Sequence, residues 1–329
     1  MKSVTRIATA VAAVAVAVAG VTGATATAYG AEPASPPKTI ALPNDGMPDG
    51  LGYQPEGIET VGDTAYISSF TDGRVMKVNL RTGDVKPLVE ADGDHALGLH
   101  VTGRLLLVAG QTSGELRVYD RFTGEQLENH EVPGAELLND ITVTGDTAYV
   151  TDSYKGVLHA FPLRADGRGL GEPRTIRLGG DFELVKESEL GRAFNGNGIT
   201  AIDAHTVLVA QTDSPDDPYG NSSELYRVDT RTGDARRVTV HGGPVLGADG
   251  IELRGSTLHV AQHSENTIAE LKLSRDGTSA THVRTIEDSD LAVPTNLAFG
   301  RGGDLYAVNS RFDVPSSGRL TYEVVRVRR

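Results

Sequence analysis

Four side chains with oxygen donors recur in one local context along the chain. Two are carboxylates and two are carboxamides, and each is followed two residues later by Ile: Glu56, Asn139, Asn197 and Asp249. Calcium takes six to eight oxygen ligands and mixes carboxylates with amide oxygens and water. Zinc and copper favour imidazole or thiolate ligands, which this set lacks. The four residues therefore predict a calcium site, with magnesium or manganese as alternatives, provided that the fold brings them together.

These residues belong to six similar units that follow one another along the chain. Each unit has a short alternating strand, a turn at Gly or Asp, and a second alternating strand, and in several units a third and a fourth strand follow. Four antiparallel strands per unit are typical of a propeller blade. Equivalent positions, 41, 42, 58, 52 and 46 residues apart, are Glu56, Leu97, Asn139, Asn197, Asp249 and Thr295. The pattern predicts an all-β fold, a six-bladed β-propeller of four-stranded antiparallel blades around a central tunnel.

The first strand of each propeller blade lines the tunnel, so the six equivalent positions should form a ring around the axis. Leu97 and Thr295 are its members that would not bind a cation. Each of the other four also has an ordinary explanation, because Asn-Asp, Asn-Gly and Asp-Gly pairs are common in turns. Their coincidence at one repeat position favours a metal site over four unrelated turns.

A second set of side chains is expected around the same mouth, because the second strand of a hairpin returns to the level where the first began. Thirteen residues after the position equivalent to Gly57, the repeats have Gln211, His263 and Asn309, and Asp152 and Arg311 lie close to two such positions. We add Asp140, which is next to the predicted ligand Asn139. We assign them to substrate contacts or to support of the ligands. His263 is the one imidazole among them, and catalytic and structural roles both stay open for it.

The ends of the chain predict processing and ring closure. Residues 1–31 have basic Lys2 and Arg6, an apolar stretch and Ala-x-Ala sites, as a secretory signal peptide does, so we expect an exported protein. Residues 32–37 form a Pro-rich tether, and residues 38–329 form one propeller domain. Residues 38–42 should complete the blade that contains residues 320–327. Residues 179–194 and 213–222 are surface insertions, the first with a helical turn at 183–190.

Composition excludes several classes of function. The net charge is −13, which disfavours nucleic acid and acidic membranes as partners. The chain has no Cys, so it has no disulfides, thiolate zinc sites or Cys nucleophile. Motifs for a serine nucleophile elbow, a phosphate-binding loop and a zinc-protease helix are absent from the sequence. We expect a monomer that acts on a small molecule.

The ring motifs resemble those of the regucalcin/gluconolactonase family and of its relative, diisopropylfluorophosphatase. The matching segments are Pro55-Glu56-Gly57, Leu138-Asn139-Asp140-Ile141, Tyr149-Val150-Thr151-Asp152-Ser153, Asn197-Gly198-Ile199 and Asp249-Gly250-Ile251. The resemblance implies that Glu56, Asn139, Asn197 and Asp249 hold a catalytic divalent ion, usually calcium. It also implies hydrolysis of sugar lactones or organophosphate esters, with Asp249 as general base or nucleophile. The sequence departs from the family at Leu97 and has no clear counterpart of the arginine that grips sugar acids, for which Arg192, Arg311 and Lys186 are candidates.

Three functions follow from these patterns. The first is an exported calcium-dependent hydrolase of lactones or esters, with phosphotriesters as a further substrate class. The second is a non-catalytic exported propeller that binds a ligand or a protein, because fold alone does not fix function. The third, a propeller like strictosidine synthase, would need a catalytic glutamate in the sixth blade, where the sequence has Asn296 and Asn309.

Overall fold

A computed structural model describes residues 35–43, 53–188, 191–314 and 320–328. The chain divides into two units, Met1–Ser35 and Pro36–Arg329. The predicted signal peptide, residues 1–31, and the start of the tether at 32–34 lie outside the described residues. No helix within the described residues is long and apolar enough to cross a membrane.

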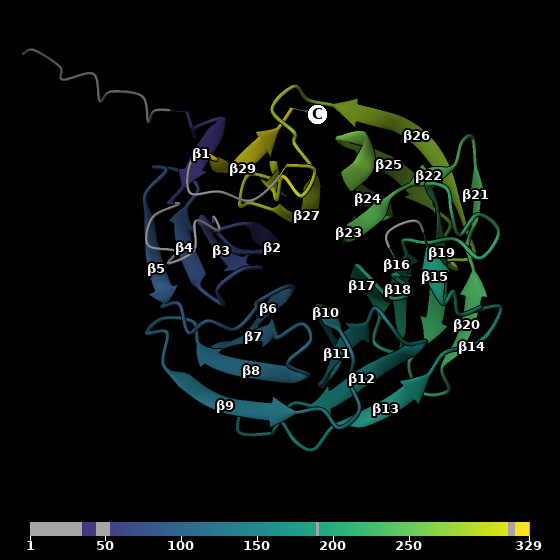
Figure 1. The fold of residues 1–329 in the computed structure, drawn as a ribbon, viewed down its shortest axis with the longest axis horizontal. Helices are drawn as coiled ribbons and strands as arrows, with labels where there is room; N and C mark the ends of the chain where they lie inside the picture. The colour runs from purple at the N-terminus through teal and green to yellow at the C-terminus, as the bar shows by residue number, and fades with distance from the viewer. Residues whose placement is uncertain (1–34, 44–52, 189–190, 315–319, 329) are drawn as a thin grey trace, which may run out of the picture. The chain divides into compact units, whose positions relative to one another are not determined.

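The second unit is all-β and forms six blades around an axis (Figure 1). From the axis outward, blades 1 to 3 are β2 (Pro55–Val61), β3 (Thr64–Ser69), β4 (Val75–Asn79), β5 (Val85–Val89); β6 (Leu99–Thr102), β7 (Leu105–Ala109), β8 (Glu115–Asp120), β9 (Gln126–Glu131); and β10 (Leu138–Thr144), β11 (Thr147–Asp152), β12 (Val157–Pro162), β13 (Arg174–Arg177). Blades 4 to 6 are β17 (Ile199–Asp203), β18 (Thr206–Gln211), β19 (Ser222–Asp229), β20 (Asp234–Arg237); β23 (Ala248–Arg254), β24 (Thr257–Gln262), β25 (Thr267–Leu273), β26 (Ser279–Glu287); and β27 (Pro294–Phe299), β28 (Leu305–Asn309), β29 (Tyr322–Val327), β1 (Thr39–Leu42). The predicted fold class is confirmed.

The sixth blade contains strands from both ends of the described chain. β1 pairs antiparallel with β29, with Ile40 opposite Val324, and the two strands lie side by side in Figure 1. This confirms the predicted closure. It also removes an edge that would otherwise be open to pairing with another chain.

Blades 4 and 5 each gain an outer strand that the sequence repeats did not predict. β14 (Gly179–Gly180) pairs parallel with β20, and β21 (Thr239–His241) pairs parallel with β26. Both extra strands come from the segment that connects one blade to the next. They cover the outer edges of these two sheets.

The helical turn predicted at residues 183–190 is wrong for its described part. Residues 183–186 are irregular, and β15 (Glu187–Ser188) pairs with β16 (Gly191–Arg192); residues 189–190 lie outside the described residues. The side chain of Asn195 accepts a hydrogen bond from Val185 N and donates one to Val185 O, both at 2.8 Å. The segment is thus held by a side chain rather than by helical hydrogen bonds.

The hydrophobic core lies between neighbouring blades. Leu107 of blade 2 packs in one cluster with Ile141 and Phe161 of blade 3. All five residues of β7 are buried, whereas outer strand β9 is largely exposed. The inner and middle strands are therefore apolar on both faces, because each face packs on an adjacent blade.

Candidate metal and substrate site

The six inner strands meet at their starts through hydrogen bonds between blades. Gly98 N donates to Asn139 O at 2.9 Å, and Thr295 Oγ1 donates to Glu56 O at 2.8 Å. Thr151 Oγ1 donates to Asn197 O in blade 4, and Thr212 Oγ1 donates to Ala248 O, one residue before the ring position of blade 5. The ring residues brought together at this level are between 0% and 8% exposed: Glu56, Leu97, Asn139, Asn197, Asp249 and Thr295.

Glycine follows the ring position in four blades because the neighbouring backbone lies against it. A Cβ at Gly98 would lie 2.5 Å from the Cα of Asp140, and a Cβ at Gly198 would lie 2.3 Å from the backbone oxygen of Asp249. These contacts are shorter than van der Waals distance and involve backbone that cannot move aside. The small residue is therefore needed to close the ring tightly.

Two hydroxyl groups fix the orientation of the ring amides. Asn139 Nδ2 donates to Ser153 Oγ at 2.9 Å, and Asn197 Nδ2 donates to Thr212 Oγ1 at 3.0 Å. Both hydroxyls donate their own hydrogen to a backbone carbonyl, so they act as acceptors toward the amides. The orientation leaves Asn139 Oδ1 buried without a hydrogen-bond partner.

The ring carboxylates are buried, and no Lys or Arg among the described residues pairs with them. Glu56 Oε2 has no hydrogen-bond partner. Burial, with the negative charges of Asp249 and Asp140, holds the pKa of Glu56 well above its usual range. Burial and the charge of Asp140 raise the pKa of Asp249 to about 8, against a hydrogen bond from Asn197. A cation among these oxygens would relieve the repulsion.

The donor set fits a hard cation that keeps open coordination positions. Within the described ranges, no group of three or more His, Cys, Asp or Glu side chains is arranged to hold a metal ion. A cation in the ring would thus depend on the two amide oxygens beside the two carboxylates. Oxygen-rich sets of this kind are typical of calcium and not of zinc.

His263 lies beside the ring, where the sequence placed it. It begins the 3₁₀ turn η1 (His263–Glu265), and its Nδ1 is 3.8 Å from Asp249 Oδ2. This is longer than a hydrogen bond. The Nδ1 atom is buried and has no hydrogen-bond partner among the described residues, and burial lowers the pKa of His263. The neutral imidazole of His263 therefore lies next to the carboxylate of Asp249, the residue predicted to act as base or nucleophile.

The count of thirteen residues fails in blades 4 and 6, because each hairpin there contains one extra residue. Ile199 pairs with Val209, whereas the equivalent Ile141 pairs with Val150. Thr212 and Ser310 thus occupy the mouth positions that the count gave to Gln211 and Asn309. Gln211 and Asn309 are fully buried one residue earlier and bind backbone: Gln211 Nε2 donates to Glu183 O, and Asn309 Nδ2 donates to Asp290 O.

Asp140 fastens blade 3 to blade 4 directly below the ring. Its Oδ1 accepts from Ile141 N at 2.9 Å and its Oδ2 from Ile199 N at 3.1 Å. Burial raises the pKa of Asp140 to about 6, although the two amide hydrogen bonds oppose the rise. Its charge nevertheless acts on both ring carboxylates, so Asp140 contributes to their electrostatics.

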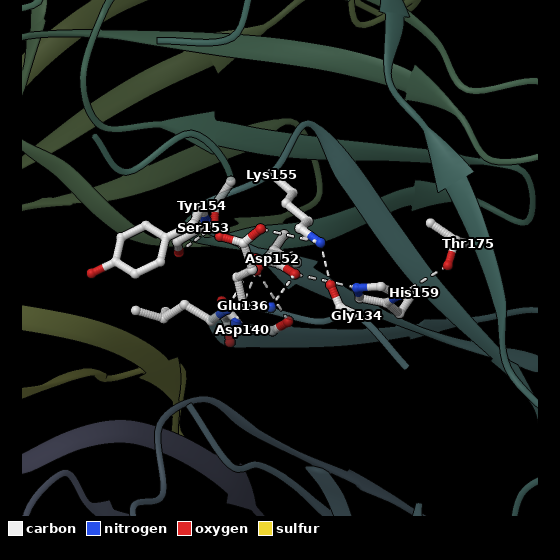
Figure 2. Close-up of polar contacts among 12 residues, drawn as sticks. Gly134, Glu136, Asp140, Asp152, Ser153, Tyr154, Lys155, His159 and Thr175 are labelled. Atoms are coloured by element: carbon white, nitrogen blue, oxygen red, sulfur yellow. Dashed lines mark hydrogen bonds and ion pairs between the residues drawn. The ribbon is translucent and has the colours of Figure 1, made fainter. Parts of the chain in front are cut away.

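Asp152 and Arg311 are committed to partners away from the ring. Asp152 accepts hydrogen bonds from Glu136 N and Leu137 N, and its Oδ2 contacts His159 Nε2 at 3.4 Å (Figure 2). Burial acts to raise the pKa of Asp152, but these hydrogen bonds leave it lowered. The guanidinium of Arg311 lies 3.1 Å from Glu323 of β29.

Arg192, the other candidate arginine, is also occupied. It pairs with Glu136 and lies over the ring of Tyr154, with its Cζ 4.1 Å from the ring centroid. Neither contact is with a ring residue.

A second polar layer lies on the far side of the tunnel and was missed by the sequence reasoning. Two residues after the ring, an apolar collar narrows the tunnel: Ile58, Leu99, Ile141, Ile199, Ile251 and Leu297. Beyond it is a cavity of about 320 Å³ whose lining includes Glu59, His100 and Glu252. His100 Nδ1 is 3.2 Å from Glu59 Oε2, and burial with nearby carboxylates raises the pKa of Glu252 to about 8. Glu59, His100 and Glu252 each lie three positions after a ring residue. An alignment of the repeats at every position would have shown this polar layer.

Comparison with known proteins identifies the fold but no family. No protein-family model matches the chain, and no curated protein matches its sequence. The resemblance to the regucalcin/gluconolactonase family thus rests on the motifs alone.

Among solved structures, the major allergen Mala s 1 of Malassezia sympodialis is 16% identical with a TM-score of 0.62, over 89% of this chain and 96% of that one. A luciferin-regenerating enzyme is 14% identical with a TM-score of 0.57, over 85% and 92%. Virginiamycin B lyase from Staphylococcus aureus is 15% identical with a TM-score of 0.55, over 82% and 81%. The chain is therefore a six-bladed β-propeller with the fold of proteins that include two enzymes.

Proposed function

We propose that the protein is a calcium-dependent hydrolase of lactones or esters, with phosphotriesters as a further substrate class. The observation that carries the proposal is the pair of buried oxygens without partners, Glu56 Oε2 and Asn139 Oδ1, on a ring that also holds Asp249. Unpaired buried acceptors are costly unless a ligand satisfies them. Virginiamycin B lyase and the luciferin-regenerating enzyme, which are among the structural neighbours, are consistent with a catalytic propeller.

Glu56, Asn139, Asn197 and Asp249 would hold the ion, with calcium first and magnesium or manganese as alternatives. When bound, the ion would polarise a carbonyl or phosphoryl oxygen of the substrate. Ser153 and Thr212 accept hydrogen bonds from the amide nitrogens of Asn139 and Asn197, so the amide oxygens point away from these hydroxyls. The ring sits in a closed circle of hydrogen bonds, so its donors are held in place before substrate arrives.

Asp249 is the residue to which we assign the chemistry, as a base toward water or as a nucleophile. The raised pKa of Asp249 belongs to the metal-free ring, and a bound cation would lower it and keep the carboxylate ionised, as a base or nucleophile requires. The Nδ1 atom of His263 is 3.8 Å from Asp249 Oδ2, so a water bound between the two side chains would contact both. The apolar collar lies between the ring and the cavity on the tunnel side, so we expect substrate to enter from the face where the inner strands start.

Export and a monomeric state complete the proposal. Both rest on the sequence, through the signal peptide at residues 1–31 and the strongly negative net charge. Amino-terminal sequencing of protein from a culture supernatant would check the first, and sedimentation the second. Mature chains should begin between Thr27 and Glu32.

The test is hydrolysis of a panel of lactones, aryl esters and phosphotriesters, before and after removal of metal by a chelator. Activity should vanish with the chelator and return with calcium. Asp249→Asn should lower kcat at least about a hundredfold, whereas Asp313→Asn, which removes an exposed carboxylate, should not. If no substrate of the panel is hydrolysed while calcium still binds, the alternative of a non-catalytic binding propeller is correct.

A further inference from the structure

A second cavity, of about 450 Å³, lies in blade 3, away from the tunnel. Cavities of this volume commonly hold small ligands. Its lining combines basic, polar and apolar side chains from blade 3 and from the insertion that precedes blade 4. They include Lys155, His159, Thr175, Arg177, Phe182 and Leu184. None of these residues belongs to the ring or to the tunnel.

The charge of this cavity is opposite to that of the protein. Its lining contains Lys155 and Arg177 and no carboxylate, although the chain carries a net charge of −13. Arg177 is exposed and has no ion-pair partner in the part of the chain that the structure describes. Lys155 lies 3.3 Å from Glu136, but this carboxylate also pairs with Arg192. Two cations share one anion there, so positive charge is left in excess.

Hydrogen-bonding groups line the same face as the free arginine. Thr175 and Arg177 are two residues apart in β13, so their side chains project from one face of the sheet. The register places Thr175 opposite His159, and Thr175 Oγ1 is 3.3 Å from His159 Nδ1. Figure 2 shows His159 between Thr175 and Asp152, with Lys155 close to the carbonyl of Gly134. Asp152 therefore fixes the ring of His159, and the hydroxyl stands at the edge of the cavity.

The insertion supplies an apolar wall. Phe182 packs against Tyr226 with ring centroids 5.0 Å apart, which holds it in place. A Cβ at Gly156 would lie 2.9 Å from the Phe182 ring, so the glycine allows the insertion to approach the turn of blade 3 closely. Leu184 is 50% exposed beside it. Phe182 and Leu184 together form the apolar side of the cavity.

We propose that this cavity binds a small organic anion with an apolar body. The anionic head, a carboxylate or a group of similar chemistry, would pair with Arg177, with Lys155 and Thr175 beside it. The apolar part would pack on Phe182 and Leu184. The site is independent of the metal ring and does not rest on the proposed hydrolase activity.

The test measures binding of octanoate to the full mature protein by calorimetry, with octanamide as the neutral probe of the same length. A chelator is present throughout, so that no carboxylate can bind through a metal ion in the tunnel. We expect octanoate to bind at least about tenfold more tightly than octanamide. Arg177→Gln should remove that preference, because charge-assisted hydrogen bonds are the stronger class.

Arg168→Gln is the matched control, since it removes an exposed positive charge of the same blade outside the cavity. Leu184→Asp is a second variant at an exposed position, and its negative charge should also weaken octanoate at least about tenfold. Equal affinity for octanoate and octanamide would overturn the proposal. So would equal affinity of the Arg177→Gln and Arg168→Gln variants for octanoate.

Discussion

Replacing Asp249 by Asn should stabilise the protein when metal is absent. The pKa of Asp249 rises from 3.8 to about 8 because the side chain is buried beside Asp140. Below the unfolded-state pKa, this acid is protonated in both states and its burial carries no charge penalty. As the pH rises from the unfolded-state pKa to the folded-state pKa, the unfolded state releases its proton first, so the folded state loses stability. The window is therefore about pH 4 to pH 8. At 1.36 kcal/mol per pKa unit, the ionised carboxylate costs about 5 kcal/mol at pH 8.

The assay is thermal unfolding in a chelator at pH 5 and pH 8, for wild type, Asp249→Asn and the exposed control Asp313→Asn. Wild type and control should lose stability between the two pH values. Asp249→Asn should lose less, and its remaining loss should come from Glu56 and Glu252, whose pKa values are also raised. At pH 8 its Tm should exceed that of wild type by roughly 10 °C. An unchanged pH dependence in Asp249→Asn, or a lower Tm than wild type at pH 8, would refute the electrostatic reasoning.

Two further predictions concern the support of the ring. Ser153→Ala removes the hydroxyl that orients Asn139 and should weaken calcium binding by about tenfold or more in a calcium titration; unchanged affinity would contradict the role of the hydroxyl. Gly98→Ala places a Cβ 2.5 Å from the Cα of Asp140 and should cost about 3 kcal/mol in urea unfolding. Gly179→Ala, with no atom within 4 Å of its Cβ, is the control and should cost less than about 1 kcal/mol.

Much of the fold could be predicted because its information is local and repeated. Alternating strands, Gly and Asp turns and a recurring period specify a blade without knowledge of any distant contact. The closure by β1 and β29 followed from the need to protect open edges. The parallel strands β14 and β21 could not be predicted, because a two- or three-residue strand has no period of its own and forms only where a connection happens to pass a sheet edge.

The candidate site was predictable where the repeats align without gaps. The ring positions precede the hairpin turn, so they were found directly. Positions after the turn were miscounted at Gln211 and Asn309, because one extra residue in a hairpin shifts every later residue to the other face. The predicted helical turn failed because the hydrogen bonds of Asn195 to a segment ten residues earlier override local propensity. The layer of Glu59 and Glu252 was missed because only one position per blade was compared.

Calcium titration of the metal-stripped protein by calorimetry at pH 8 tests the central claim most directly. Wild type should bind one ion in the ring, and Glu56→Gln should abolish this binding while the protein stays folded, because Glu56 Oε2 is one of the oxygens left without a partner. Glu125→Gln, at an exposed turn, is the matched control and should bind as wild type does. Calcium binding that is equal in Glu56→Gln and wild type would contradict the account.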